Sequence, residues 1–372
     1  MERVRVPLAG RTYDILVGRG LIRRLAGLLP PELSGRKLAV VADARVAALF
    51  GEDLDAGLKP LGGPAAFLEV PPGDASKNFR NLERLCLALI EAGIARDDAV
   101  IAFGGGMVGD LAGLAAALVR RGVGLVQIPT TLLAQVDSAV GGKTAINVPA
   151  GKNLIGTFHQ PRLVVADLAL LSTLAARERR AGLAEIAKYG LIADSEFWGW
   201  LKAGGLAATD ALDPEALARA VATSCRIKAT IVAADEREET GRRFLLNLGH
   251  TFAHALEKAA GYDSARLLHG EAVAVGVVLA ARLSETLGIA EGGLAEEIAG
   301  VLGAVGLPSR IADLFRRDPP AASALLAAMG QDKKIREGRP SFVLLRRPGE
   351  ALVRRDVPEG EVLAVLAESG AA

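Results

Sequence analysis

The sequence predicts an α/β domain with a largely parallel sheet, followed by a mostly α-helical domain. In the first half of the chain, short apolar runs alternate with stretches of helical length and composition, as in α/β layers. After about Leu171 the alternation ends, and nearly everything from Ala175 to Met329 has helical composition. The chain has 372 residues, 51% of them apolar, which is more than one core usually holds. We therefore predict one domain over residues 1–170 and another over 171–372.

Five buried strands are expected in the first domain, because five apolar runs each end at turn residues. They cover residues 37–42, 65–70, 99–103, 124–128 and 162–166. Helices are expected between them over 82–92 and 110–121. Near the C-terminus, residues 341–345 and 351–354 predict a small hairpin, and a last helix is expected near 359–368.

Composition and charge exclude several classes of protein. The chain has 44 Lys+Arg and 43 Asp+Glu, so no overall field favours nucleic acid or an anionic membrane. Cys86 and Cys225 are far apart, which argues against a disulfide framework and fits a reducing compartment. Residues 1–7 lack the apolar core of a signal peptide, and the longest apolar runs are too short to span a bilayer. We expect a cytoplasmic protein.

A glycine turn follows the strand expected at 99–103. Gly104-Gly105-Gly106-Met107-Val108-Gly109 forms G-x-G-x-x-G between that strand and a helix, the context that a dinucleotide-binding turn requires. Such a turn can equally be a packing device. No acidic residue ends a following strand about 20 residues on, so Asp43 is the better candidate for a ribose contact. We therefore interpret the first domain as a variant of the Rossmann fold that binds a nucleotide.

A second loop carries hydroxyls, glycines and a lysine. It runs from Pro129-Thr130-Thr131 to Asp137 and on through Gly141-Gly142-Lys143-Thr144, a composition that suits phosphate or hydroxyl ligands. Position 137 is Asp, so the first glycine of G-x-x-x-x-G-K-[ST] is missing and ATP hydrolysis is disfavoured. The alternative is an ordinary glycine turn with a surface lysine.

Three of the four histidines, His250, His254 and His269, fall within twenty residues. His250 and His254 are spaced i,i+4, on one face of a helix. Upstream, Glu185 and Lys188 lie on a helix of their own. Two imidazoles and one carboxylate from separate helices make an open zinc site. Position 251 is Thr, so the general base of an H-E-x-x-H peptidase is absent. The alternative is a set of hydrogen-bonded core histidines.

The motifs themselves closely resemble those of 3-dehydroquinate synthases. The resemblance rests on residues 103–153, on AGLAEIAKYGLI (181–192), DEREETGRRFLLNLGHTFAHALE (235–257) and LHGEAVAVG (268–276), and on QDKK (331–334). It covers nearly the whole chain in family order. It implies an N-terminal NAD-binding α/β domain, a helical metal-binding domain with zinc or cobalt, and a homodimer.

The resemblance also implies a reaction. 3-deoxy-D-arabino-heptulosonate 7-phosphate becomes 3-dehydroquinate and phosphate, a step of the shikimate pathway. NAD oxidises a ring alcohol, phosphate leaves by elimination, the hydride returns, the ring opens, and an aldol step closes the carbocycle. The enzyme would then be a carbon–oxygen lyase that regenerates its NAD within one turnover.

Position by position, the resemblance implies three sets of site residues. The metal ligands are Glu185, His250 and His269. The residues implied to bind or act on the substrate are Arg120 (from the neighbouring subunit), Asp137, Lys143, Lys152, Asn153, Lys188, Lys228, Arg243, Asn247, His254 and Lys333. The residues implied to bind NAD are Asp43, Asp74, Lys77, Gly105, Gly106, Asp110, Thr130, Thr131 and Thr173, together with Lys143 and Lys152. Departures from the family stand at Asp74, Ala139, Ala175 and Ala253, where members commonly have Glu, Ser, Pro and Gly.

Two alternative enzymes share this plan. A related sugar phosphate cyclase making valiolone- or inosose-type products would differ mainly at the substrate end, where Lys228, Asn247 and His254 take the dehydroquinate form. A metal-dependent polyol dehydrogenase would release NADH and would not need the lysine-rich phosphate site. A non-catalytic NAD sensor would be expected to lack some of Glu185, His250, His269 and Lys143, and all four are present.

Overall fold

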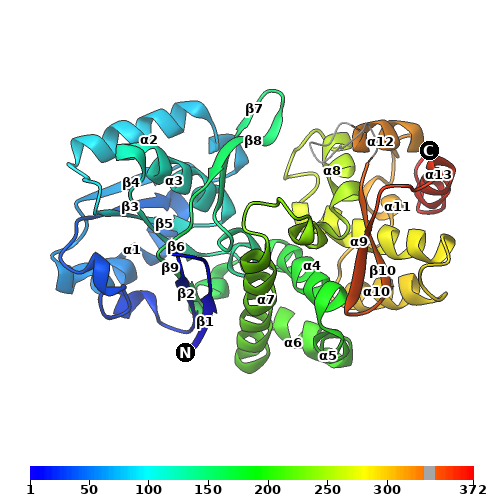
Figure 1. Ribbon diagram of the computed structural model, residues 1–372, viewed down its shortest axis with the longest axis horizontal. Helices are drawn as coiled ribbons and strands as arrows, with labels where there is room; N and C mark the ends of the chain where they lie inside the picture. The colour runs from blue at the N-terminus through cyan, green and yellow to red at the C-terminus, as the bar shows by residue number, and fades with distance from the viewer. Residues whose placement is uncertain (331–339) are drawn as a thin grey trace. The chain divides into compact units, whose positions relative to one another are not determined.

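The computed structural model describes residues 1–330 and 340–372, and the chain forms two compact units. The first unit is Met1–Leu174 with Val221–Arg237, and the second is Ala175–Ala220 with Glu238–Ala372. The predicted fold class, an α/β region followed by a mostly helical one, is confirmed (Figure 1). The predicted domain boundary at residue 170 stays a prediction. The two units are not divided at a single point of the sequence, since helix α7 (Pro214–Ala234) begins in the second unit and continues in the first.

The first unit is built on a seven-stranded sheet in the order β1-β2-β9-β6-β5-β3-β4. Only β1 and β2 pair antiparallel, and the other neighbours are parallel. The strands are β1 (Glu2–Val6), β2 (Tyr13–Gly18), β3 (Leu38–Asp43), β4 (Ala66–Val70), β5 (Ala99–Gly104), β6 (Gly124–Pro129) and β9 (Leu163–Asp167). The five predicted strands are β3, β4, β5, β6 and β9, each found within one residue of its predicted bounds.

Helices cover both faces of this sheet because successive strand residues point to opposite sides. Val41 and Val100 pack on one face with α2 (Phe79–Glu91) and α3 (Gly106–Leu118). Val40 and Ile101 pack on the other face with α1 (Ala44–Leu58). Figure 1 shows α2 and α3 together on one side of the strands and α1 on the other. Helices α2 and α3 begin three and four residues before their predicted starts.

This unit also contains a separate two-stranded hairpin, which was not predicted. It consists of β7 (Lys143–Val148) and β8 (Gly151–Phe158). The Asn147 amide donates to the Lys77 carbonyl at 2.8 Å, so the hairpin is tied to the segment that follows β4. Most of β8 is exposed, which explains why no run of buried apolar residues marked it.

The second unit is organised around α9 (His269–Thr286), which is buried along nearly its whole length. Helices α4, α8, α10 and α13 and strand β10 pack against it. The other elements of the unit are α4 (Ala176–Ala193), α5 (Ser195–Trp200), α6 (Leu206–Asp210), α8 (His250–Ala259), α10 (Leu294–Gly303), α11 (Ile311–Leu314), α12 (Ala322–Met329), β10 (Phe342–Arg347), β11 (Glu350–Arg354) and α13 (Glu359–Glu368). The predicted C-terminal hairpin and last helix are therefore present. None of the helices within the described ranges is both long and apolar enough to cross a membrane.

Candidate functional site

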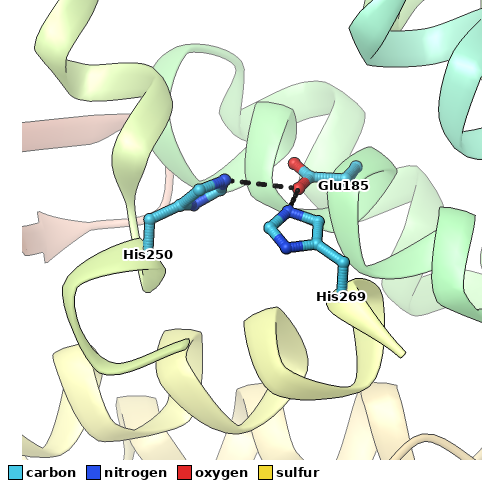
Figure 2. A group of neighbouring side chains, drawn as sticks. All are labelled: Glu185, His250 and His269. Atoms are coloured by element: carbon cyan, nitrogen blue, oxygen red, sulfur yellow. Dashed lines mark ion pairs between the residues drawn. The ribbon is translucent and has the colours of Figure 1, made fainter. Parts of the chain in front are cut away.

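Three side chains from three helices of the second unit converge on one point. Glu185 comes from α4, His250 begins α8 and His269 begins α9, and one ligand atom of each lies within 4.8 Å of the others. The Glu185 Oε1 atom lies 3.5 Å from His250 Nε2 and 3.4 Å from His269 Nε2. Figure 2 shows both imidazole rings directed at the carboxylate. The three residues that the resemblance implies as metal ligands are thus brought together.

Glycines allow the three helices to approach this closely. A β-carbon at Gly270 would lie 1.9 Å from the Ala181 carbonyl oxygen of α4, one turn before Glu185. A β-carbon at Gly276 of α9 would lie 2.2 Å from the carbonyl oxygen of Gly249, which has φ +78° and precedes His250. No side chain fits at these contacts. Glycine at these positions therefore sets the distances between the three candidate ligands.

The polar atoms at this point fit a divalent cation. Glu185 is fully buried, and neither of its carboxylate oxygens has a hydrogen-bond partner among the described residues, although the Lys188 ammonium forms an ion pair with Oε2. A buried oxygen without a partner is costly, and a metal ion would satisfy it. The His250 Nδ1 atom lies 3.1 Å from the Leu248 carbonyl, which leaves Nε2 facing Glu185. Two imidazoles and one carboxylate match zinc or a similar metal.

A fourth residue, Glu257 of α8, was missed by the sequence analysis. Its Oε2 atom lies 3.3 Å from His269 Nδ1, on the side of the ring away from Glu185. Burial by itself lowers the pKa of His269, but the carboxylates of Glu257 and Glu185 outweigh it and raise that pKa to about 10. Glu257 lies seven residues after His250, on the same face of α8, and that spacing was the signal available.

His254 lies beside this cluster without being one of its three ligands. Its ring centroid is 5.7 Å from that of His250 and 6.5 Å from that of His269. Two further predicted substrate residues lie nearby in sequence, just before α8. Arg243 is almost completely buried, with Nε 3.6 Å from a Glu238 carboxylate oxygen, and Asn247 donates to the Phe244 carbonyl at 3.0 Å. Lys333 lies outside the described residues.

In the first unit, the glycine turn stands where ligands bind in open α/β sheets. The chain goes from β3 to the edge strand β4 and returns on the opposite side of β3 as β5. The carboxyl ends of β3 and β5 therefore form a topological switch point, the usual ligand position. Asp43 ends β3 and the Gly104–Gly106 turn ends β5, and a β-carbon at Gly104 would lie 3.3 Å from that of Asp43. One Asp43 oxygen accepts from the amides of Arg45 and Val46.

Two buried hydroxyls beside the turn have no hydrogen-bond partner among residues 1–330 and 340–372: Thr130 Oγ1 and Ser138 Oγ. The Thr130 amide donates to the Gly104 carbonyl at 3.0 Å. Ser138 Oγ would lie 2.8 Å from a β-carbon at Gly106. Buried hydroxyls are normally paired, so these two atoms fit the polar groups of a bound nucleotide. The first turn of α3 adds amide groups of the kind that bind pyrophosphate.

The predicted cofactor and substrate residues form two further groups in the first unit. The Lys77 ammonium contacts both Asp110 and Asn153, and Lys152 pairs with Asp74 at 3.0 Å. Burial raises the pKa of Asp110, although Lys77 opposes the shift. In the other group, Lys228 of α7 donates to the Asp137 carbonyl at 2.7 Å and pairs with its carboxylate.

The other predicted residues of this unit are Arg120, Thr131, Lys143 and Thr173. Lys143 is exposed at the start of β7, and Thr173 is exposed at the end of a 3-10 helix (Leu168–Thr173). Thr131 Oγ1 accepts from the Ala134 amide at 3.2 Å. Arg120 is exposed and has φ +53°, and the next residue, Arg121, has φ +65°. Two consecutive arginines in the left-handed region are unusual and mark a strained turn.

Comparisons with known proteins agree with this geometry. Residues 67–181 match the model of the 3-dehydroquinate synthase N-terminal domain, and residues 182–335 match that of the C-terminal domain. The 3-dehydroquinate synthase of Sinorhizobium medicae is 52% identical over 374 residues, covering 99% of this chain and 96% of the relative. That of Rhizobium rhizogenes is 50% identical over 372 residues, covering 98% and 96%.

Solved structures resemble the chain over its length. The 2-epi-5-epi-valiolone synthase ValA of Streptomyces hygroscopicus, solved with NAD+ and Zn2+ bound, has a TM-score of 0.86 at 30% identity, covering 97% of this chain and 98% of that one. A 2-deoxy-scyllo-inosose synthase with Co2+ and NAD+ has a TM-score of 0.87 at 24% identity, covering 99% and 100%, and shows the shared fold.

Proposed function

The chain belongs to the 3-dehydroquinate synthase family, and on that premise we propose how its own residues carry out the family's reaction. The activity is the conversion of 3-deoxy-D-arabino-heptulosonate 7-phosphate to 3-dehydroquinate and phosphate. Because phosphate leaves by breaking a carbon–oxygen bond, the enzyme is a carbon–oxygen lyase. The observation that carries the proposal is the convergence of His250 and His269 on the buried Glu185 carboxylate. Its Oε1 atom has no hydrogen-bond partner in the described chain, and its Oε2 atom forms an ion pair with Lys188.

The cofactors are a divalent metal, zinc or cobalt, and NAD. Glu185, His250 and His269 hold the metal, which when bound would act as a Lewis acid on a substrate hydroxyl. NAD, when bound, would supply reversible hydride transfer with the ring alcohol. The amide groups of Gly105 and Gly106, at the start of α3, would bind its pyrophosphate, and the Thr130 hydroxyl would form a hydrogen bond with a polar group of the cofactor.

The other site residues bind and orient the substrate. A substrate with a carboxylate and a phosphate needs several cations, and this near-neutral chain supplies them locally. We assign that role to Lys143, Lys152, Lys188, Lys228, Arg243 and Lys333, with Asp137, Asn153 and Asn247 as hydrogen-bonding partners. His254, adjacent to the metal ligands, holds or moves the proton of the reacting hydroxyl or the departing phosphate.

The active form is a homodimer in the cytoplasm. Arg120 reaches the substrate of the neighbouring subunit, and its strained, exposed turn supports this assignment because such backbone strain is retained at functional sites. Both cysteines are free thiols, as suits a reducing compartment.

The proposed substrate is tested by product analysis. The purified protein is incubated with 3-deoxy-D-arabino-heptulosonate 7-phosphate and, separately, with a panel of other sugar phosphates. Equimolar 3-dehydroquinate and phosphate from the first substrate alone are expected. Turnover of another sugar phosphate in its place would assign the chain to a sister cyclase activity.

A further inference from the structure

Glu257 lies directly behind one of the candidate metal ligands. The two ring nitrogens of His269 face two different carboxylates, Nε2 at 3.4 Å from Glu185 Oε1 and Nδ1 at 3.3 Å from Glu257 Oε2. The Glu257 side chain is 7% exposed, so little solvent competes for this contact. Its backbone carbonyl accepts from the Tyr262 amide at 2.8 Å, where α8 ends, which fixes the residue independently of its side chain.

The contact between His269 and Glu257 can orient a metal ligand, because of the way an imidazole binds a metal. An imidazole that binds a metal through Nε2 carries its proton on Nδ1, and a carboxylate that accepts this proton fixes the tautomer and the ring orientation. It also makes Nε2 more basic, which strengthens the metal bond. His250 has a different arrangement, because its Nδ1 faces the neutral Leu248 carbonyl at 3.1 Å. The two histidines are therefore oriented by groups of different charge.

We propose that Glu257 is the positioning residue of the metal centre, which orients His269 and thereby sets the affinity of the site for its divalent metal. The proposal rests on the metal site assigned above and adds a residue to it. Helix α8 then supplies both a ligand, His250, and the group that orients the other imidazole ligand. Glu257 itself touches neither substrate nor metal.

The test measures metal affinity without substrate. Zinc and cobalt are titrated into metal-free protein against a competing chelator, and the visible absorption of the cobalt form is recorded. Glu257→Gln removes the charge at nearly constant shape, and Glu257→Ala also removes the acceptor. We expect affinity to fall about 10-fold in the first variant and nearer 100-fold in the second. The cobalt spectrum should change in both, and Glu257→Asp should restore part of the affinity.

A matched control is Glu297→Gln in α10. Glu297 also accepts from an aromatic ring N–H, that of Trp198 at 2.8 Å. Unlike His269, Trp198 is not one of the three clustered ligands, so this contact does not orient a ligand. Glu297→Gln should leave affinity and spectrum unchanged. If Glu257→Ala does not fold, the nearly isosteric Glu257→Gln decides. Wild-type affinity and an unchanged cobalt spectrum in Glu257→Gln would overturn the proposal, provided that Glu185→Gln loses the metal. A wild-type protein that binds no metal would overturn the metal site as well.

Discussion

Gly270 lies against Ala181 so closely that a β-carbon at residue 270 would stand 1.9 Å from the Ala181 carbonyl oxygen. The contact joins the start of α9, which carries His269, to the helix that carries Glu185. A backbone oxygen cannot rotate away as a side chain can. The distance between two candidate ligands therefore depends on the absence of a single methyl group.

Gly270→Ala should accordingly separate α4 from α9. We expect a loss of about 3 kcal/mol or more in the free energy of unfolding, together with weaker metal binding. Denaturant unfolding and chelator competition measure the two effects. Gly300→Ala in α10 is the control, since a β-carbon there meets nothing within 4 Å and alanine favours a helix. Equal stability of the two variants would contradict the role of the Gly270–Ala181 contact in holding α4 and α9 together.

His269→Ala and His254→Ala should separate metal binding from catalysis. His269 is one of the three clustered ligands, so its loss should abolish both metal content and phosphate release. His254 lies beside the cluster, so His254→Ala should keep its metal while kcat falls about 10²- to 10⁴-fold. Metal analysis and turnover on the same preparations check this. A fully active, metal-free His269→Ala protein would disprove the ligand assignment.

Thr130→Val should lower NAD affinity without lowering the stability of the protein. The Thr130 hydroxyl is buried and has no partner in the described chain, so replacing it should leave the free energy of unfolding unchanged or raise it by about 1 kcal/mol. NAD affinity should fall about 10-fold because one hydrogen bond is lost. Thr144→Val is the contrast: its hydroxyl donates to the Thr157 carbonyl at 2.9 Å, so stability should fall while NAD binding persists.

The pH dependence of stability should carry a contribution from His159. Burial lowers the pKa of this imidazole, whose Nε2 lies 2.9 Å from the Val123 carbonyl. The unfolded chain therefore takes up a proton near pH 6.5 that the folded chain does not, and stability falls as the pH drops below that value. His159→Gln should remove this part of the slope. If the free energy of unfolding changed equally with pH in the two proteins between pH 7.5 and pH 5, the contribution assigned to His159 would be contradicted.

Much of the fold could be predicted because buried strands and long helices leave strong local patterns. The run Ala99–Gly104 is wholly buried, and the glycine turn at its end predicted that a helix follows, although α3 begins four residues before the predicted start. The β7–β8 hairpin escaped prediction because β8 is mostly exposed and shows no apolar run. Its place is set by a tertiary contact, the Asn147 amide on the Lys77 carbonyl.

In the candidate site, too, some residues could be predicted from the sequence and others depend on tertiary contacts. Clustered histidines and a resemblance placed Glu185, His250 and His269 in one group, and the structure brings them together. Glu257 offered only its seven-residue spacing from His250, because its position behind His269 depends on the approach of another helix. The glycine contacts that set these distances are likewise visible only once α4 and α9 are packed. The roles of the substrate lysines stay predictions.

The metal- and NAD-dependent cyclase activity is tested most simply by phosphate release from 3-deoxy-D-arabino-heptulosonate 7-phosphate by the purified protein with catalytic NAD, with and without a chelator. We expect phosphate release that the chelator abolishes, that added zinc or cobalt restores, and that leaves no net NADH. Chelator-insensitive release by protein shown to be metal-free, or NADH accumulating in step with phosphate, would contradict it.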